Sequence, residues 1–271
     1  MIKKIFLDSR FEYLLPLKTK CKRIGSNFDG GYVIREQDFK LIEKIVSFGM
    51  GSNHKDWSFE LSFLKEKKIE ILYFDHTVSV RNYLSNIFKT LRRVIKLRYS
   101  FKRLLEELLD LYKYILLIKF SKINHFKKKI CSNPQLPHEL NPKQILSNIE
   151  NDKILLKIDI EGGEYDIIDQ IIEHNNKIIS ILIEFHELNK FEKKFEQKIK
   201  KLKSNFEIIH LHGNNNDGII TGNLPSTIEV TLVNKKYVNE VKEKEYNYDF
   251  PIDGLDFPNN SSKPDLFFSF K

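Results

Sequence analysis

The stretch from residue 154 to 187 constrains the fold more than any other part of this chain. Two apolar runs rich in β-branched residues, 154–160 and 178–185, flank a segment whose apolar residues recur near helical spacing from 165 to 172. Strand, helix and strand at this spacing predict a βαβ unit, in which the two strands are parallel neighbours.

Both predicted strands of this unit end in ionisable residues. Asp159 and Glu161 follow the first strand, and Glu184 and His186 follow the second. In open α/β sheets, ligands bind at the carboxyl ends of the strands, so we expect these side chains to line one crevice. The alternative is that they merely end the strands and cap the helix.

A second strand–turn–helix–strand pattern precedes this unit. Residues 44–48 predict a strand, Gly49 and Gly51 lie in the turn after it, and the next strand, 69–74, ends at Asp75. Glycines leave room for a ribose or phosphate against backbone, and a strand-end carboxylate can accept both ribose hydroxyl protons. The pattern suits an adenosine-containing ligand, although an ordinary β–α turn with a surface aspartate remains open.

The charge of the chain is concentrated in one segment. The 271 residues carry a net charge of +8, whereas residues 81–130 contain fourteen basic and three acidic residues, which leaves about −3 for the rest. This segment has helical spacing, so we expect one α/β domain over residues 1–271 with a basic helical insertion at about 80–130. A solvated face, a phosphate-rich substrate, an anionic membrane surface or a partner subunit would each fit its charge.

The remaining composition narrows the class of protein. Only Cys21 and Cys131 are present, so a disulfide framework is not expected and a reducing cytoplasm fits. The first residues lack the long apolar region of a signal peptide, and no run reaches the length of a membrane span. We expect no nucleic-acid partner, because no recognised binding module is present.

Two further segments carry glycine turns. Asp29-Gly30-Gly31 predicts either a hairpin turn or a loop across a bound ligand, with Arg23 supplying charge nearby. Residues 208–212 predict a strand followed by a glycine- and asparagine-rich loop, and residues 227–233 alternate like a strand in an antiparallel edge hairpin.

Several blocks of this sequence resemble one family when taken in order. They are Arg23-Ile-Gly25 with Asp29-Gly-Gly-Tyr-Val33, Ser47-Phe-Gly-Met-Gly51, Phe74-Asp75, Lys157-Ile-Asp-Ile-Glu-Gly162 with Glu164, Ile183-Glu-Phe-His186 and His210-Leu-His-Gly-Asn-Asn215. The chain resembles the FkbM-type S-adenosylmethionine-dependent methyltransferases, many of which sit in bacterial polysaccharide or antibiotic gene sets. The resemblance covers most of the chain except the basic segment.

The resemblance implies a Rossmann-like methyltransferase sheet that is mostly parallel with an antiparallel terminal strand. It implies S-adenosylmethionine as cofactor, and transfer of its methyl group to a hydroxyl of a nucleotide-linked sugar or bacterial surface polysaccharide. The residues expected on the cofactor side are Arg23, Gly49, Gly51, Asp75, Asp159 and Ile160. Those expected on the substrate side are Tyr32, Glu161, Asn214 and Asn215.

Methyl transfer to a sugar hydroxyl benefits from a positioned base. His186 is the first candidate and His212 the second, since each follows a predicted strand. Asp159 and Glu184, with Glu161, would orient the histidine or the acceptor, or Asp159 and Glu184 would instead hold Mg²⁺.

Other functions remain open at this point. A nicotinamide-dependent oxidoreductase would also use a glycine turn and a strand-end Asp75, but the third glycine of its fingerprint is missing. A non-catalytic binding protein could use the basic segment to dock on an anionic surface or to form a homo-oligomer. Methylation of nitrogen rather than oxygen is also compatible with the sequence.

Overall fold

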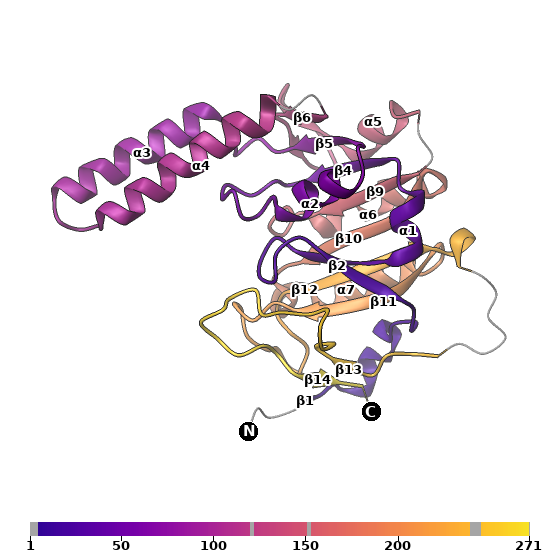
Figure 1. Ribbon diagram of the computed structural model, residues 1–271. Helices are drawn as coiled ribbons and strands as arrows, with labels where there is room; N and C mark the ends of the chain where they lie inside the picture. The colour runs from indigo at the N-terminus through magenta and orange to yellow at the C-terminus, as the bar shows by residue number, and fades with distance from the viewer. Residues whose placement is uncertain (1–4, 120–121, 151–152, 239–244, 271) are drawn as a thin grey trace.

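The computed structural model describes residues 5–119, 122–150, 153–238 and 245–270. Its centre is a seven-stranded sheet in the order β11-β12-β10-β9-β4-β5-β6 (Figure 1). The strands are β4 (Lys44–Phe48), β5 (Glu70–Phe74), β6 (Ile123–Phe126), β9 (Ile154–Ile158), β10 (Ile178–Phe185), β11 (Phe206–Gly213) and β12 (Ile228–Asn234).

Strand directions confirm the predicted α/β fold. β4 pairs in parallel with β5 and β9, β5 with β6, and β9 with β10, whereas β12 is antiparallel to both β10 and β11. Residues 227–233 fall on β12, which pairs antiparallel with β11 at one edge of the sheet, as predicted, with β11 as the outermost strand. The crossover from β10 to β11 skips one position of the sheet, and β12 returns to fill it.

Helices cover both faces of this sheet. They are α1 (Glu36–Leu41), α2 (Ser58–Glu66), α3 (Val80–Ile95), α4 (Phe101–Lys119), α5 (Pro142–Ser147), α6 (Glu164–Ile172) and α7 (Leu188–Leu202). One core joins the α5, α6 and α7 side of the sheet, and a second joins α2 and the end of α4 to the other side. In β9, Leu156 faces the first core and Leu155 the second, so this strand is buried on both sides, as its continuous apolar run predicts.

The central βαβ unit, β9–α6–β10, therefore forms as the sequence predicts. Its two strands are adjacent and parallel, with Ile158 opposite Ile183 at their carboxyl ends. The β4–α2–β5 pattern also forms, with Phe48 opposite Phe74. Because β4 pairs with β9 as well, the two units share one sheet and their strand ends meet at one edge.

The basic insertion is a two-helix arm formed by Val80–Lys119, which projects from the sheet in Figure 1. Its base packs on the second core through Tyr83, Tyr114 and Leu117. The predicted boundary at about 130 is wrong, because Ile123–Phe126 pairs with β5 as a strand of the central sheet. Among the described residues, no helix combines the length and apolar character required to cross a membrane.

Short strands complete the fold around the sheet. β2 (Cys21–Ile24) and β3 (Tyr32–Arg35) form the antiparallel hairpin predicted around Asp29-Gly30-Gly31. β1 (Ile5–Phe6), β14 (Phe268–Ser269) and β13 (Asp249–Phe250) form a second small sheet, and β7 (Lys129–Ile130) pairs with β8 (Glu139–Leu140). Cys21 and Cys131 are both free thiols.

Candidate functional site

Two adjoining pockets open at the carboxyl edge of the central sheet. The first, here the β4–β5 pocket, measures about 460 Å³ and is lined by Gly49, Gly51, Phe74, Asp75, His76, Thr77, residues 128–132, Asp159, Ile160, Glu161, Gly163 and Asp166. The second, the β9–β10 pocket, measures about 250 Å³ and is lined by Asp29, Gly30, Tyr32, Met50, Gly51, Asp56, Lys157, Asp159, Glu161, Glu184, His186, Asn214, Asn216 and Asp217. Gly51, Asp159 and Glu161 line both pockets, so the two spaces share a wall.

The glycine turn after β4 is held against the end of β9. Gly49 adopts a φ of +85°, and a Cβ built on it would lie 1.7 Å from the carbonyl oxygen of Asp159. Gly51 adopts a φ of +72°, and its Cβ would meet the Asp56 carboxylate. Both positions therefore require glycine for backbone conformation and for close approach, and the turn forms a floor of the β4–β5 pocket.

Replacing Gly49 with alanine is expected to weaken ligand binding in the β4–β5 pocket at least about tenfold, because the clash with Asp159 must separate β4 from β9. Calorimetric titration of a ligand of this pocket measures the change. Gly254→Ala is the matched control, since Gly254 has a φ of +75° but no atom within 4 Å of its Cβ position. Equal losses in both variants would show that backbone strain, not the clash, weakens binding.

Asp75 joins the glycine turn to the loop after β5. One carboxylate oxygen accepts from the Met50 backbone N–H at 2.9 Å, and the other accepts from the Thr77 backbone N–H and Oγ1 at 2.7 and 2.6 Å. These bonds fix the carboxylate in the wall of the β4–β5 pocket. An ionised carboxylate offers about four lone-pair positions, so one acceptor position remains for a ligand hydroxyl.

The β9–β10 pocket is rich in carboxylates. Six acidic residues line it against two basic ones. The acidic residues are Asp29, Asp56, Asp159, Glu161, Glu184 and Asp217, and the basic residues are Lys157 and His186. Such a pocket favours ligands that donate hydrogen bonds or carry positive charge, and it repels phosphate.

His186 lies at the centre of the acidic cluster. Its Nδ1 is 3.0 Å from Oε1 of Glu164, and its Nε2 lies 3.8 Å from Asp159 and 3.9 Å from Glu184. Glu164 also accepts from the backbone N–H groups of Ile160 and Gly162, so one buried carboxylate orders the β9–α6 loop and the imidazole together. The Nε2 atom is thereby directed at the wall that the two pockets share.

The pKa values of this cluster follow from burial and charge. Burial alone would lower the pKa of His186, but the hydrogen bond to Glu164 and the charges of Glu184 and Asp159 raise it to about 10. Burial raises the pKa of Asp159 to about 6 against the opposing charges of Lys157 and His186. Burial also raises the pKa of Glu184 well above its usual value. The cluster therefore stabilises one positive charge between its carboxylates.

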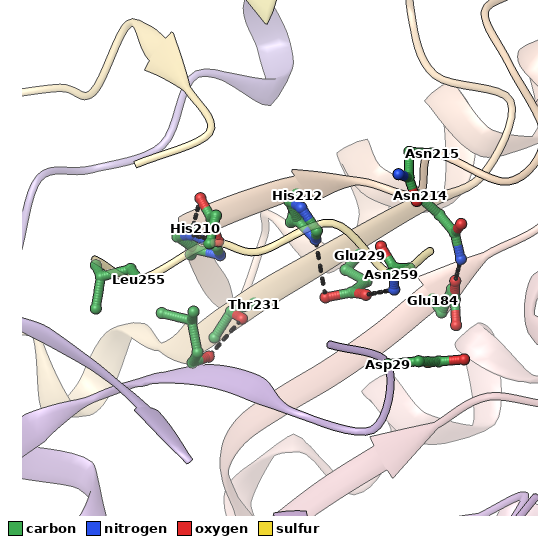
Figure 2. Close-up of polar contacts among 12 residues, drawn as sticks. Asp29, Glu184, His210, His212, Asn214, Asn215, Glu229, Thr231, Leu255 and Asn259 are labelled. Carbon is green, nitrogen blue, oxygen red and sulfur yellow. Dashed lines mark hydrogen bonds and ion pairs between the residues drawn. The ribbon is translucent and has the colours of Figure 1, made fainter. Parts of the chain in front are cut away.

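Two residues of the cluster have unusual surroundings or backbone. Glu161 has a φ of 55°, in the left-handed region that a non-glycine residue rarely occupies. Glu184 is only 5% exposed, and its Oε1 accepts from Nδ2 of Asn214 at 2.8 Å. Figure 2 shows Asn214 reaching this carboxylate from the loop after β11. The loop after β9, the end of β10 and the loop after β11 therefore all contribute side chains to the β9–β10 pocket.

Lys157 is a buried cation on the face of β9 that points away from the first core. Its Nζ lies 3.2 Å from Oε1 of Glu60 and 4.7 Å from the centre of the Tyr32 ring. Lys157 points away from the first core because it alternates with Leu156 and Ile158 along the strand. Tyr32 lines the β9–β10 pocket, as predicted, and Lys157 lies over its ring, a contact that the sequence pattern did not indicate.

The structure brings most of the predicted site residues to the two pockets. The exceptions are Arg23, His212 and Asn215, whose side chains line neither pocket. Arg23 donates to the carbonyls of Ser26, Phe28 and Leu255, and Asn215 donates to carbonyls of the loop 260–264. Both side chains are therefore engaged in holding loops in place, and neither reaches the two pockets.

His212 belongs to a separate buried network behind the pocket. Its Nε2 lies 3.3 Å from both carboxylate oxygens of Asp265, and its Nδ1 lies 3.6 Å from Glu229 (Figure 2). Glu229 in turn accepts from Asn259 at 2.8 Å. This network ties the C-terminal loop to β11 and β12, and it gives His212 a structural role.

Several pocket residues were not identified from sequence. Lys157, Asp56 and Asp217 line the β9–β10 pocket, and residues 128–132, with Cys131 among them, line the β4–β5 pocket. Glu164, which lines neither pocket but holds His186, did give a local signal, because it stands at the start of a helix directly after a double glycine. The others follow turns or lie inside a strand, where nothing local marks a pocket.

Comparisons with known proteins find similarity at the level of the fold. No protein-family model and no curated protein sequence matches this chain. TYW2 of M. jannaschii, solved with AdoMet, is 10% identical over 73% of this chain and 72% of that one, with a TM-score of 0.33. The 23S rRNA methyltransferase ErmE is 9% identical over 74% of this chain and 68% of that one, with a TM-score of 0.36. SAH-bound PaMTH1 of Podospora anserina is 11% identical over 71% of this chain and 72% of that one, with a TM-score of 0.34. At these values the similarity is one of chain path and extends to no side chain.

Proposed function

We propose that this protein is an S-adenosylmethionine-dependent methyltransferase whose acceptor is a hydroxyl of a sugar. The observation that carries the proposal is the pair of adjoining pockets, one with the glycine turn and Asp75, the other lined by carboxylates. A group-transfer enzyme needs a donor site and an acceptor site that meet at the reacting atoms. Asp159 and Glu161 lie in the wall where these two pockets meet.

The β4–β5 pocket fits the methyl donor. Its volume of about 460 Å³ lies in the usual range for cofactor sites, roughly 300–1,000 Å³. Phe74, Ile130 and Ile160 offer apolar walls for an adenine ring, and Asp75 offers an acceptor for ribose hydroxyls. Asp159 adds negative charge where a sulfonium would lie. S-adenosylmethionine bound there supplies a methyl group on a positively charged sulfur.

The β9–β10 pocket fits a neutral, hydroxyl-rich acceptor. Six carboxylates and Asn214 can accept or share hydrogen bonds with several hydroxyls, and the excess of negative charge disfavours a phosphate at the reacting end. A nucleotide-linked sugar would therefore place its diphosphate outside this pocket. A neutral glycan chain presents hydroxyls without a phosphate, so we favour a surface polysaccharide or its precursor as the acceptor.

Asp159 is the residue we propose to accept the hydroxyl proton. His186 remains the first histidine of the site, but its pKa of about 10 keeps Nε2 protonated near neutral pH. An imidazolium has no free lone pair, so it would orient Asp159 and the acceptor rather than take the proton. The pKa of Asp159, about 6, suits a base that is ionised near pH 7.

The resemblance to FkbM-type methyltransferases supports the same assignment. Its most specific block, Asp159-Ile-Glu-Gly162, contributes Asp159 and Glu161 to the wall that the two pockets share, and the block Ile183–His186 contributes Glu184 and His186 to the acceptor side. Many members of that family sit in bacterial polysaccharide or antibiotic gene sets, which agrees with the hydroxyl-rich acceptor that the pocket favours.

A divalent cation is a second candidate for the same three side chains. Asp159, Glu184 and His186 each offer one ligand atom, and these three atoms lie within 4.8 Å of one another. Glu164 orients the histidine through Nδ1, in the way that a second carboxylate commonly orients a metal-bound imidazole. Mg²⁺ would bind vicinal hydroxyls of the acceptor and favour their ionisation.

The proposal predicts that the purified chain binds S-adenosylmethionine and is thermally stabilised by it, whereas reduced nicotinamide cofactors give no shift. Isothermal calorimetry and thermal melting measure this directly. Asp75→Ala should lose at least about tenfold in affinity, since the ribose hydroxyls lose a charged acceptor worth roughly 1.5–3 kcal/mol. Stabilisation by the nicotinamide cofactors alone would contradict the proposal and favour an oxidoreductase.

Transfer of a labelled methyl group to a panel of glycans and amines then identifies the acceptor class. Assays with a chelator, and then with magnesium restored, distinguish Asp159 acting as a base from a divalent cation held by Asp159, Glu184 and His186. Full turnover in chelator supports Asp159 as a base acting without a metal. Loss in chelator with recovery on adding magnesium assigns the three side chains to a cation.

A further inference from the structure

The arm formed by α3 and α4 presents apolar side chains that pack against nothing in the described fold. On α3, Leu84, Phe88, Leu91 and Ile95 recur at intervals of four, three and four residues, and all are exposed. This spacing puts them on one face of the helix. Phe88, for example, is 63% exposed, so neither α4 nor the sheet covers this apolar face of α3.

α4 repeats the same spacing. Phe101, Leu105, Leu108 and Tyr112 are all exposed, again at intervals of four, three and four residues. The two helices pack on each other through other positions, where Thr90 donates to Glu107 and Leu104 is buried. Each helix of the arm therefore keeps one apolar stripe for contact with another surface.

The turn between the helices is the most exposed apolar point of the arm. Leu97 is 94% exposed and has a φ of 54°, a conformation that costs a branched side chain free energy and favours glycine. Its backbone N–H donates to the carbonyl of Val94, and the side chain points into solvent. Ile95, at 73% exposed, lies beside it in the chain.

Positive charge surrounds the same tip. Residues 89–103 include seven basic residues and no acidic one. In the described part of the chain, the side chains of Lys89, Arg92, Lys96, Arg98 and Lys102 form no ion pair, and all five are exposed. The tip thus combines free cations with exposed aliphatic groups.

The acidic residues of the arm are already engaged within the chain. Asp110 pairs with His54 at 2.5 Å, and Glu107 lies 3.4 Å from Arg103, which also approaches Glu106 at 3.9 Å. A second copy of the arm would therefore add positive charge to positive charge. Charge complementarity favours an anionic surface over self-association.

From these observations we propose that the tip of the arm docks this protein on an anionic lipid bilayer. Lys and Arg side chains are attracted to acidic headgroups, and Leu97 with its apolar neighbours enters the region between headgroups and acyl chains. The arm leaves the sheet just after β5, at the edge where both pockets open. Docking of the tip therefore holds this edge of the sheet within about the length of the arm, roughly 24 Å for the 16 residues of α3, of a membrane surface.

The test is flotation of the full chain with vesicles of phosphatidylcholine alone or mixed in equal parts with phosphatidylglycerol. Binding to the mixed vesicles only, weakening as salt is raised, is the expected result. Arg92→Gln with Lys96→Gln should lower the partition coefficient about thirtyfold, because each charge contributes roughly 1 kcal/mol and every 1.4 kcal/mol is a factor of ten. Lys65→Gln with Lys68→Gln, on and just after α2, is the matched control and should bind like the wild type.

The apolar part of the proposal has its own variants. Ile95→Ser with Leu97→Ser should lower binding to the mixed vesicles at least about tenfold, whereas Leu136→Ser, at another exposed leucine, should not. Absence of binding to mixed vesicles, or equal binding by the tip variants, overturns the proposal. So does a dimer that the tip variants abolish, or retention on RNA without vesicle binding. None of these readouts depends on methyl transfer, so they are distinct from failure of the proposed function.

Discussion

Replacing Asp159 with asparagine is expected to lower the rate of methyl transfer by about 10²–10⁴-fold while the chain stays folded. Asparagine has the same shape, but its amide cannot accept the hydroxyl proton and is a weaker cation ligand than a carboxylate. The loss is therefore expected whether the cluster acts as a base or holds Mg²⁺. Single-turnover measurements with saturating donor separate the transfer step from product release.

Asp159→Asn should lower donor affinity much less than the transfer rate, because it removes one charge near the sulfonium but keeps the backbone N–H of Asp159 bonded to the Phe48 carbonyl, which holds the strand end. Asp169→Asn is the matched control, since Asp169 pairs with Lys198 and Lys201 on the surface of α6. A transfer rate that is the same in both variants would refute the role of Asp159. An equal loss of donor binding and transfer would instead place its effect on the β4–β5 pocket.

Replacing His212 with alanine is expected to lower the free energy of unfolding by roughly 3–5 kcal/mol, the usual cost of breaking a buried ion pair. His212 is 1% exposed and lies between Glu229 and Asp265, which would face each other without a cation. Urea unfolding measures the difference. His138→Ala, at an exposed histidine, is the control and should change stability by less than about 0.5 kcal/mol.

The contribution of His212 should depend on pH with a defined sign. Burial alone would lower its pKa, but the hydrogen bonds to Asp265 and Glu229 raise the pKa to about 10. A raised pKa stabilises the folded chain fully below the unfolded value, roughly 6.5, and this stabilisation is lost as pH rises through about 10. The stability gap between wild type and His212→Ala should therefore shrink from pH 6 to pH 10. Unchanged stability with lost turnover would return His212 to the role of catalytic base.

Adding Glu229→Gln to His212→Ala tests the pair itself. The double variant should lose less stability than the sum of the single variants, since removing the cation matters less once one carboxylate is neutral. Strict additivity would show that His212 contributes by packing alone. Figure 2 shows His212 and Glu229 pointing toward each other from β11 and β12.

Local patterns were sufficient for the elements that form the site. The apolar runs of β9 and β10 and the helical spacing between them depend on neighbouring residues, so the βαβ unit was predictable. Parallel strands bring their carboxyl ends to one edge, which is why Asp75, Asp159 and Glu184 were expected together. Both pockets lie at that edge, as the pattern predicted. The roles assigned to individual residues remain predictions.

Other features depended on contacts between distant segments. The predicted histidine and arginine roles illustrate this, because His212 meets Asp265 and Arg23 meets the Leu255 carbonyl, both far along the chain. The protonated state of His186 also depends on several carboxylates from different elements. A sequence pattern gives the type of a residue but not the charges around it, which decide its pKa.

The amino-acid order by itself determined the alternation of strands and helices, the glycine turn after β4, the acidic strand ends and the basic character of the arm. Only the tertiary structure decided that β12 enters between β10 and β11, that Lys157 and Asp56 face the same pocket as Glu184, and that the apolar stripes of the arm stay uncovered. The physical reason is the distance along the chain over which each effect acts. Periodicity and turn chemistry act over a few residues, whereas burial, charge and strand order depend on which distant segments pack together.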